Sequence, residues 1–208
     1  MLNLPLTTEF SKRVPKQMFY EKTAITPALK KVFVEQIKSI TWANKIAPTT
    51  LNISEGKSVT EIQVIRILLH SDNFDVSVLK HIDKAIPYHN IYVLEYDGKF
   101  QVWLRFRDDS ENFTKYFNTT WLPEAELPLK IDGLNLDTVY ENFVLQVSGI
   151  EKVGNDSVAV QIKNADKTEK LKIEIARLEK QARAEKQPKK KFELAQKIKK
   201  LNKKIQGG

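Results

Sequence analysis

The stretch NIYVLEYDGKFQVWLRF, residues 90–106, contains two runs rich in β-branched and aromatic residues, separated by Asp97-Gly98. The Asp-Gly dipeptide favours a tight type I′ turn, which joins two antiparallel strands. In the second run apolar residues alternate with more polar ones, which is the pattern of a strand with one buried face. The stretch therefore predicts a β-hairpin, and we expect the sheet that contains it to organise the fold.

Segments on both sides of the hairpin predict further strands. TEIQVIRILL, residues 60–69, is a β-branched run typical of a central strand, and SITWANKI, residues 39–46, predicts a strand that ends at Pro48. NFTKYFNTTWL, residues 112–122, follows the hairpin and predicts one more antiparallel strand. Together these segments indicate a mixed, largely antiparallel sheet.

Three segments predict helices that pack on this sheet. Thr26-Pro27 places an N-cap hydroxyl before a proline at the first helical position, and the helix should run to about Ser39. Asp75 is expected to cap a helix that stops at Pro87, and Asp137 is expected to cap a later helix. The order of helices and strands predicts an α+β fold.

The C-terminal segment has a helical pattern of a different kind. From Leu171 apolar residues recur at spacings of four, three and four, Pro188 interrupts the pattern, and the same spacing then returns. Two such seams predict an antiparallel helical hairpin or one kinked helix that packs on a partner. We therefore divide the chain into an α+β body, residues 1–164, and a basic, coiled-coil-like helical tail, residues 165–208. The seam residues expected to bind a partner are Leu194, Ile198, Leu201 and Ile205.

The positive charge of the chain is concentrated in this tail. The whole chain has 34 Lys and Arg against 26 Asp and Glu. Residues 165–208 contain 15 basic and 6 acidic residues, which leaves 19 basic and 20 acidic residues in the body. Such asymmetry indicates an acidic partner such as nucleic acid, a membrane surface or a protein, although lysine-rich usage also arises from an AT-biased genome.

The lysines of the tail are the nucleic-acid-binding residues that we expect. Lysine is a flexible point charge, so a lysine stripe suits phosphate contacts that do not depend on base sequence. The alternative is a solvated outer helix face supported by pairs such as Glu179 with Arg183 and Glu193 with Lys197. The lysines in question are Lys189, Lys190, Lys191, Lys197, Lys200 and Lys204.

The hairpin offers a second candidate surface for DNA or RNA. Alternation places Trp103, Arg105 and Arg107 on one strand face, and aromatic residues interleaved with arginine can stack single-stranded nucleic acid. The competing interpretation buries Trp103 under a helix and pairs the arginines with Asp108, Asp109 or Glu111. Both interpretations remain open at the level of sequence.

Several classes of site are unsupported by the sequence. The chain has no cysteine, so thiolate metal sites, disulfides and cysteine nucleophiles are excluded. Its 7 glycines form no phosphate-binding loop, and neither a Gly-x-Ser-x-Gly elbow nor a His-Glu-x-x-His motif occurs. His81 and Asp83 lie two apart on a predicted helix and point to different faces. We therefore expect no cofactor and no metal, and assign no catalytic residue.

The targeting signals of the chain are equally sparse. The start lacks a basic segment followed by an apolar run, so we expect no secretory signal. No run of about 18 apolar residues occurs, so we expect no membrane span. Together with the lack of cysteine, this predicts a cytoplasmic protein.

One catalytic alternative centres on Glu61. Restriction-type nucleases use an acid-x-lysine triplet to hold Mg²⁺, and Glu61-Ile62-Gln63 has glutamine where the lysine should stand. A site of this kind would lie near Glu61 together with Lys16, Lys45 or Gln63, and the sequence shows no partner lysine that completes it. This leaves a metal-dependent nuclease or small hydrolase near Glu61 as an open alternative.

Several short motifs carry a resemblance over nearly the whole chain. They are Val14-Pro15-Lys16, Trp42 with Lys45-Ile46-Ala47-Pro48, Glu61-Ile62-Gln63-Val64, Ile82-Asp83-Lys84-Ala85-Ile86-Pro87, and Glu185-Lys186-Gln187 with Lys191. In these the chain resembles the bacterial and archaeal domain-of-unknown-function 4391 family. The resemblance implies a place among helicases, DNA methyltransferases and restriction-type subunits in antiviral-defence-like gene clusters. It implies no activity and supplies no catalytic residue.

These observations favour a non-catalytic accessory subunit of a DNA-processing or restriction-like defence system. Its body would dock on a helicase or methyltransferase partner, and its tail would contact nucleic acid or that partner. The alternatives are the nuclease or hydrolase near Glu61 and an inhibitor or antitoxin-like protein binder.

Overall fold

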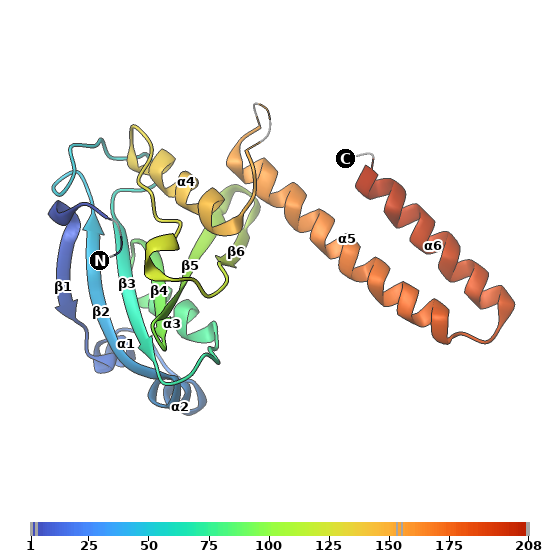
Figure 1. The fold of residues 1–208 in the computed structure, drawn as a ribbon, viewed down its shortest axis with the longest axis horizontal. Coiled ribbons are helices and arrows are strands. Elements are labelled where there is room, and N and C mark those ends of the chain that lie inside the picture. Colours follow the sequence, from blue (N-terminus) through green and yellow to red (C-terminus); the bar gives the residue numbers. More distant parts are fainter. Residues whose placement is uncertain (1, 3, 153, 155, 207–208) are drawn as a thin grey trace. The chain divides into compact units, whose positions relative to one another are not determined.

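The structure, a computed structural model, describes residues 2, 4–152, 154 and 156–206. The chain forms two compact units, Met1–Gly149 and Ile150–Gly208. The first unit contains the sheet and the helices that pack on it, and the second contains two long helices (Figure 1).

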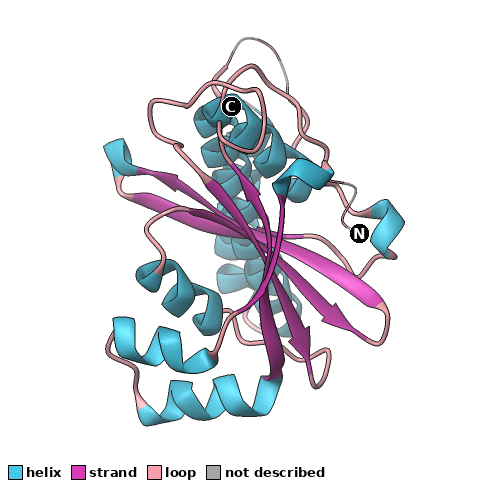
Figure 2. Ribbon diagram, turned by 90° about the vertical axis from the view of Figure 1, so that its left-hand side faces the viewer, coloured by secondary structure: helices cyan, strands magenta, loops and turns pink. Residues whose placement is uncertain are grey.

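The first unit is built on one six-stranded sheet in which the strands lie in chain order, β1 to β6. Neighbouring strands are antiparallel except β3 and β4, which are parallel. The sheet is therefore mixed and largely antiparallel, and the predicted α+β class is confirmed (Figure 2). The strands are β1 (Glu9–Arg13), β2 (Ile37–Ile46), β3 (Ile62–Leu69), β4 (His89–Tyr96), β5 (Lys99–Asp108) and β6 (Phe113–Asn118).

Helices α1 (Lys16–Lys22), α2 (Pro27–Gln36) and α3 (Ser77–Ala85) pack over one face of the sheet. The predicted cap of α2 is confirmed, because the Thr26 hydroxyl accepts the Leu29 N–H at 3.3 Å. Asp75 accepts the Ser77 N–H at 2.8 Å at the start of α3. The core on this face joins side chains from all three helices to β2, β3 and β4, with Phe19, Phe33, Leu79, Ile67 and Tyr92 fully buried.

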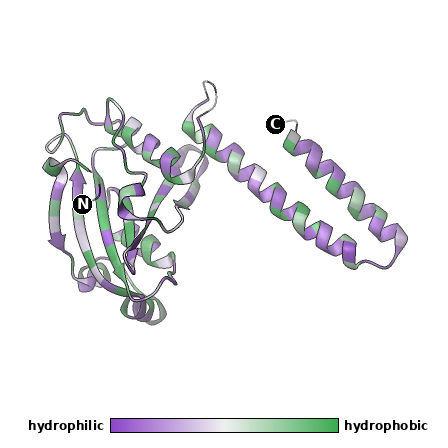
Figure 3. Ribbon diagram, in the orientation of Figure 1, coloured by the Kyte–Doolittle hydropathy of each residue, from purple (hydrophilic) through white to green (hydrophobic). Residues whose placement is uncertain are grey.

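The opposite face is covered by α4 (Leu136–Ser148), which packs on β5 and β6. Because side chains alternate along a strand, this face receives Val64, Val93, Val102 and Leu104, all fully buried. Apolar residues consequently dominate the central strands on both faces (Figure 3). Three short 3-10 turns complete the unit, at Leu6–Thr8, Asp109–Glu111 and Glu124–Glu126.

The prediction that Asp137 caps α4 is wrong. The cap is Asn135, whose side-chain oxygen accepts the Thr138 N–H at 3.0 Å. Asp137 lies in the first turn, and its carboxylate instead accepts the backbone N–H groups of residues 57, 58 and 59 at 2.7, 3.1 and 2.8 Å. Both residue types are good N-caps, so the local sequence does not distinguish them.

The second unit is an antiparallel hairpin of α5 (Val158–Ala184) and α6 (Pro188–Gln206), as the two seams predict. Ser157 caps α5 by accepting the Val160 N–H at 3.3 Å, and Pro188 is the first residue of α6. The hairpin therefore includes residues upstream of the predicted division at residue 164. Among the residues described in both units, no helix is long and apolar enough to cross a membrane.

The hairpin turn at Asp97-Gly98 gives a direct test of the fold. Both residues have positive φ, 48° and 69°, as a type I′ turn requires. A β-branched side chain is strained in this region, so we expect Gly98→Val to lower the free energy of unfolding by about 1–2 kcal/mol. Urea unfolding measures the change. Gly98→Asn is the control and should cost less, because asparagine tolerates left-handed backbone; equal stability of Gly98→Val and the parent would contradict the turn assignment.

Candidate functional site

Helix α6 carries the densest positive charge of the second unit. It contains eight lysines and a single acidic residue, Glu193. All eight lysine side chains are exposed, and within the described part of the chain none of them forms an ion pair. The predicted pair of Glu193 with Lys197 is accordingly not formed there. Figure 3 shows α6 as a largely hydrophilic helix.

Several basic side chains of α5, in contrast, form ion pairs. Lys170 pairs with Asp166 at 2.8 Å, Arg177 with Glu174 at 2.7 Å, and the predicted pair of Arg183 with Glu179 is formed at 3.6 Å. These three pairs lie within α5 itself, at spacings of three or four residues. The net positive potential of the hairpin therefore arises mainly from α6.

The apolar seam closes the hairpin. Ile175 and Leu178 of α5 are buried, and the four seam residues predicted to bind a partner are half-buried in α6. An open groove between the helices is lined by Leu178, Leu194 and Leu201, and the lysine stripe borders it. The stripe consists of Lys197, Lys200 and Lys204. The groove thus brings the lysine stripe together with two of the predicted seam residues, Leu194 and Leu201.

The predicted stacking surface on β5 is largely engaged inside the first unit. Trp103 is half-buried against Phe74, with ring centroids 6.4 Å apart. Arg105 points to the buried carboxylate of Asp83, 3.7 Å from its Oδ2. Arg107 is exposed and pairs with Asp109. These contacts favour the packing interpretation, and nucleic-acid contact by the three residues stays a prediction.

A polar row crosses the sheet on the face that α3 covers. Lys45 of β2 is the register partner of Gln63 on β3, which is in turn the partner of Asn90 on β4. The row continues on β5 and β6, where Arg105 is the partner of Tyr116. These residues are far apart in the sequence, and only the register of the strands aligns them.

Asp83 of α3 lies above the middle of this row and is almost fully buried. Its carboxylate accepts hydrogen bonds from Asn90 and from the Tyr92 hydroxyl, both at 2.8 Å, and from the Tyr116 hydroxyl. A buried carboxylate is stable only when it is paired and hydrogen-bonded in this way. The sequence placed Asp83 on a helix but gave no signal for its partners.

Burial shifts the pKa values of several titratable groups near Asp83. Desolvation raises the pKa of Tyr92 and Tyr116, and the Asp83 charge raises it further, so both hydroxyls remain hydrogen-bond donors. Desolvation lowers the pKa of His89, and the charge of Arg105 adds to the effect. His89 packs edge-on against Tyr140 at 4.5 Å.

Glu61, just before β3, contacts the Lys45 end of this polar row. Its carboxylate is 2.6 Å from Lys45 Nζ and accepts a hydrogen bond from Gln63. Lys16 does not join them, because its ammonium group donates to the Ile37 carbonyl. Of the two lysines considered, Lys45 is therefore the one that lies beside Glu61. Within the described residues, however, no three His, Cys, Asp or Glu side chains converge as metal ligands.

The buried histidine of α3 has a packing role. His81 Nε2 lies 3.0 Å from the Phe19 carbonyl and 3.0 Å from the Thr23 hydroxyl, and the ring packs edge-on against Phe33. These contacts link α3 to α1 and α2.

Residues 2–205 match the family model described as Domain of unknown function (DUF4391). The chain belongs to this family. The comparisons with curated proteins and with solved structures returned no match. The family match covers nearly the whole chain, and the family description names no activity.

The burial of His89 can be tested by the pH dependence of stability. Its folded-state pKa is lowered, so the unfolded chain binds more protons than the folded chain between the two pKa values. The corresponding stability is present above the unfolded pKa of about 6.5 and is lost as pH falls through the folded pKa. We expect His89→Gln to lose less stability than the parent between pH 8 and pH 5, measured by urea unfolding. An identical pH dependence of both proteins would contradict this assignment.

Proposed function

We propose that the protein is a non-catalytic accessory subunit of a DNA-processing or restriction-like defence system, which docks on a helicase or methyltransferase partner and contacts nucleic acid through α6. The observation that carries the proposal is the set of eight exposed α6 lysines that form no ion pair within the described chain. The context implied by the family resemblance supports the choice of partner.

The arrangement of charge suits a phosphate backbone. Lys197 and Lys204 are separated by two turns of helix, about 10 Å at 1.5 Å per residue. Duplex DNA presents one phosphate charge per about 1.7 Å of its axis, so a stripe of this length faces several phosphates. Lysine ammonium groups provide charge without the planar fork that reads bases, which favours binding without sequence preference.

Docking on a protein partner would use the apolar groove beside the same stripe. The seam residues Leu194, Ile198, Leu201 and Ile205 are half-buried, so part of each side chain remains accessible. Phe192 adds a large apolar side chain that is 64% exposed on α6. Exposed aromatic residues are frequent anchors of protein interfaces.

The salt dependence of binding tests the nucleic-acid contact. We expect affinity for a fluorescein-labelled 24-base-pair DNA duplex to fall as salt rises, because bound lysines displace counterions from phosphates. Three phosphate contacts contribute about 2 to 3 to the magnitude of the slope of log binding constant against log salt concentration. Fluorescence anisotropy titrations should show that this share of the slope is lost in the triple variant Lys197→Gln, Lys200→Gln, Lys204→Gln. Parallel titrations with single-stranded RNA compare the affinity for RNA with the affinity for DNA.

The matched control removes the same charge from the first unit. The variant Lys80→Gln, Lys99→Gln, Lys130→Gln changes three exposed lysines and should keep the parent slope. If both triple variants lowered the slope equally, binding would depend on net charge and not on α6. Salt-insensitive behaviour of the parent would leave α6 as a solvated helix face.

The nuclease alternative is favoured by one observation, the contact of Lys45 with Glu61. Against it, within the described residues no three His, Cys, Asp or Glu side chains converge on Glu61 to hold a metal ion. We expect no Mg²⁺-dependent cleavage of DNA or RNA by the purified protein. Cleavage that a folded Glu61→Gln variant lost, and that the ion-paired control Glu95→Gln kept, would establish the nuclease.

A further inference from the structure

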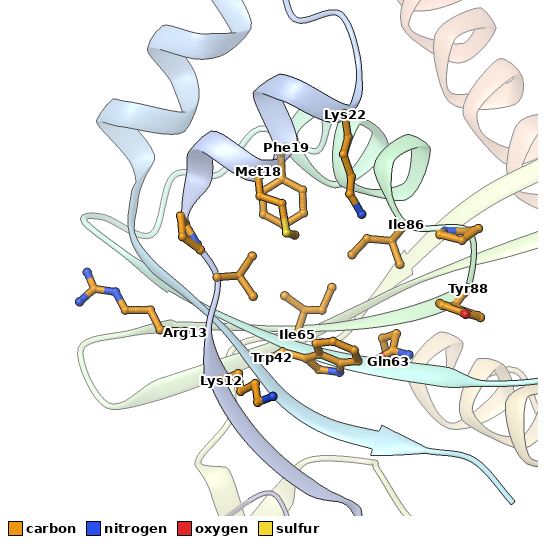
Figure 4. A pocket seen from close by; sticks show the side chains of 13 residues that line it. Lys12, Arg13, Met18, Phe19, Lys22, Trp42, Gln63, Ile65, Ile86 and Tyr88 are labelled. Carbon is orange, nitrogen blue, oxygen red and sulfur yellow. The ribbon is translucent and has the colours of Figure 1, made fainter. Parts of the chain in front are cut away.

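The first unit contains an apolar pocket of about 310 Å³, at the lower end of the range of about 300–1,000 Å³ typical of ligand sites. It lies between α1, the β1–α1 connection, strands β2 and β3, and the residues that follow α3. Met18, Ile65, Trp42 and Ile86 supply much of its carbon surface (Figure 4).

Gln63, which lines this pocket, has a buried amide oxygen without a hydrogen-bond partner among the described residues. Gln63 is only 2% exposed, and its Nε2 donates to Glu61. Its Oε1 is buried and accepts no hydrogen bond from the described residues. A buried carbonyl oxygen without a donor costs free energy, so a bound molecule that supplies an N–H or O–H would be stabilised here.

The charged residues in the described lining of the pocket are all basic. Its described lining includes Lys12, Arg13 and Lys22 but no Asp or Glu. In Figure 4 Lys22 extends from α1 toward the space between Met18, Ile86 and Trp42, whereas Arg13 points away. None of the three cations forms an ion pair within the described residues. Charge complementarity therefore favours an anionic group at the mouth.

We propose that this pocket binds a small organic anion with an apolar, ring-sized body and one N–H or O–H donor. The body would occupy the space beside Trp42 and the anionic group would lie near Lys22. The donor would bind Gln63 Oε1 after a rotation of that side chain, because this oxygen is buried when the pocket is empty. A nucleobase fits less well, because its several polar edge atoms would face carbon and lose their hydrogen bonds to water.

Three probes of matched shape separate these contacts in calorimetric titrations of the full-length protein. Indole-3-acetate has the ring, the N–H and the carboxylate; benzothiophene-3-acetate lacks the N–H; 3-methylindole lacks the carboxylate. Leaving a buried acceptor unpaired should weaken the second probe about 5- to 100-fold. Losing one partly exposed ion pair should weaken the third about two- to fivefold.

Variants of the protein assign each contact to a residue. Gln63→Leu should abolish the preference for indole-3-acetate over benzothiophene-3-acetate. Lys22→Gln should abolish the preference over 3-methylindole, whereas the exposed control Lys38→Gln should retain it. Met18→Trp should fill the pocket and block all three probes, and Val34→Trp, on an exposed position of α2, should not.

Thermal unfolding confirms that each variant is folded, and Gln63→Met replaces Gln63→Leu if the latter is not. Failure of indole-3-acetate to bind the parent at 1 mM would overturn the proposal. Binding that Met18→Trp left unchanged, or equal affinity for all three probes, would overturn it as well. These outcomes do not depend on α6, so they are independent of the proposed nucleic-acid contact.

Discussion

The parallel pairing of β3 with β4 is the constraint on which the first unit depends. Parallel neighbours cannot be joined by a tight turn, so the chain must cross over one face of the sheet, and α3 forms that crossover. The crossover places Asp83 above β4 and brings it within reach of Tyr116 on β6. The same pairing puts Gln63 beside Asn90, at the centre of the polar row.

The sequence predicts elements well where the deciding signal is local. The Asp97-Gly98 turn, the Thr26 cap and the two seams around Pro188 each depend on residues a few positions apart, and all are confirmed. The strand β1 and helix α1 were missed, because their residues are mostly exposed or half-buried and show no clear period. The Asp83 partners were missed because they depend on the register between distant strands. For Glu61 the sequence leaves Lys16, Lys45 and Gln63 open as neighbours, and the register of β2 with β3 brings Lys45 beside it.

The two units differ in how their charged side chains are paired. In the first unit the charged groups of the polar row are paired or hydrogen-bonded, because burial makes an unpaired charge costly. In the second unit the α6 lysines are exposed and close to one another in the sequence, so they repel and are accessible to an external anion. The hairpin tolerates this repulsion because the apolar seam holds the two helices together.

The bonds from Asp137 to residues 57–59 have a consequence for the order of folding. The Lys57 amide and the Asp137 carboxylate are 80 positions apart, so closing this contact incurs the entropy of a long loop unless the intervening strands have already formed. Local hairpins and helices close faster than contacts of such sequence separation. The three amides before β3 therefore obtain these bonds only once α4 lies against the segment. During synthesis this requires that residue 137 has already left the ribosome.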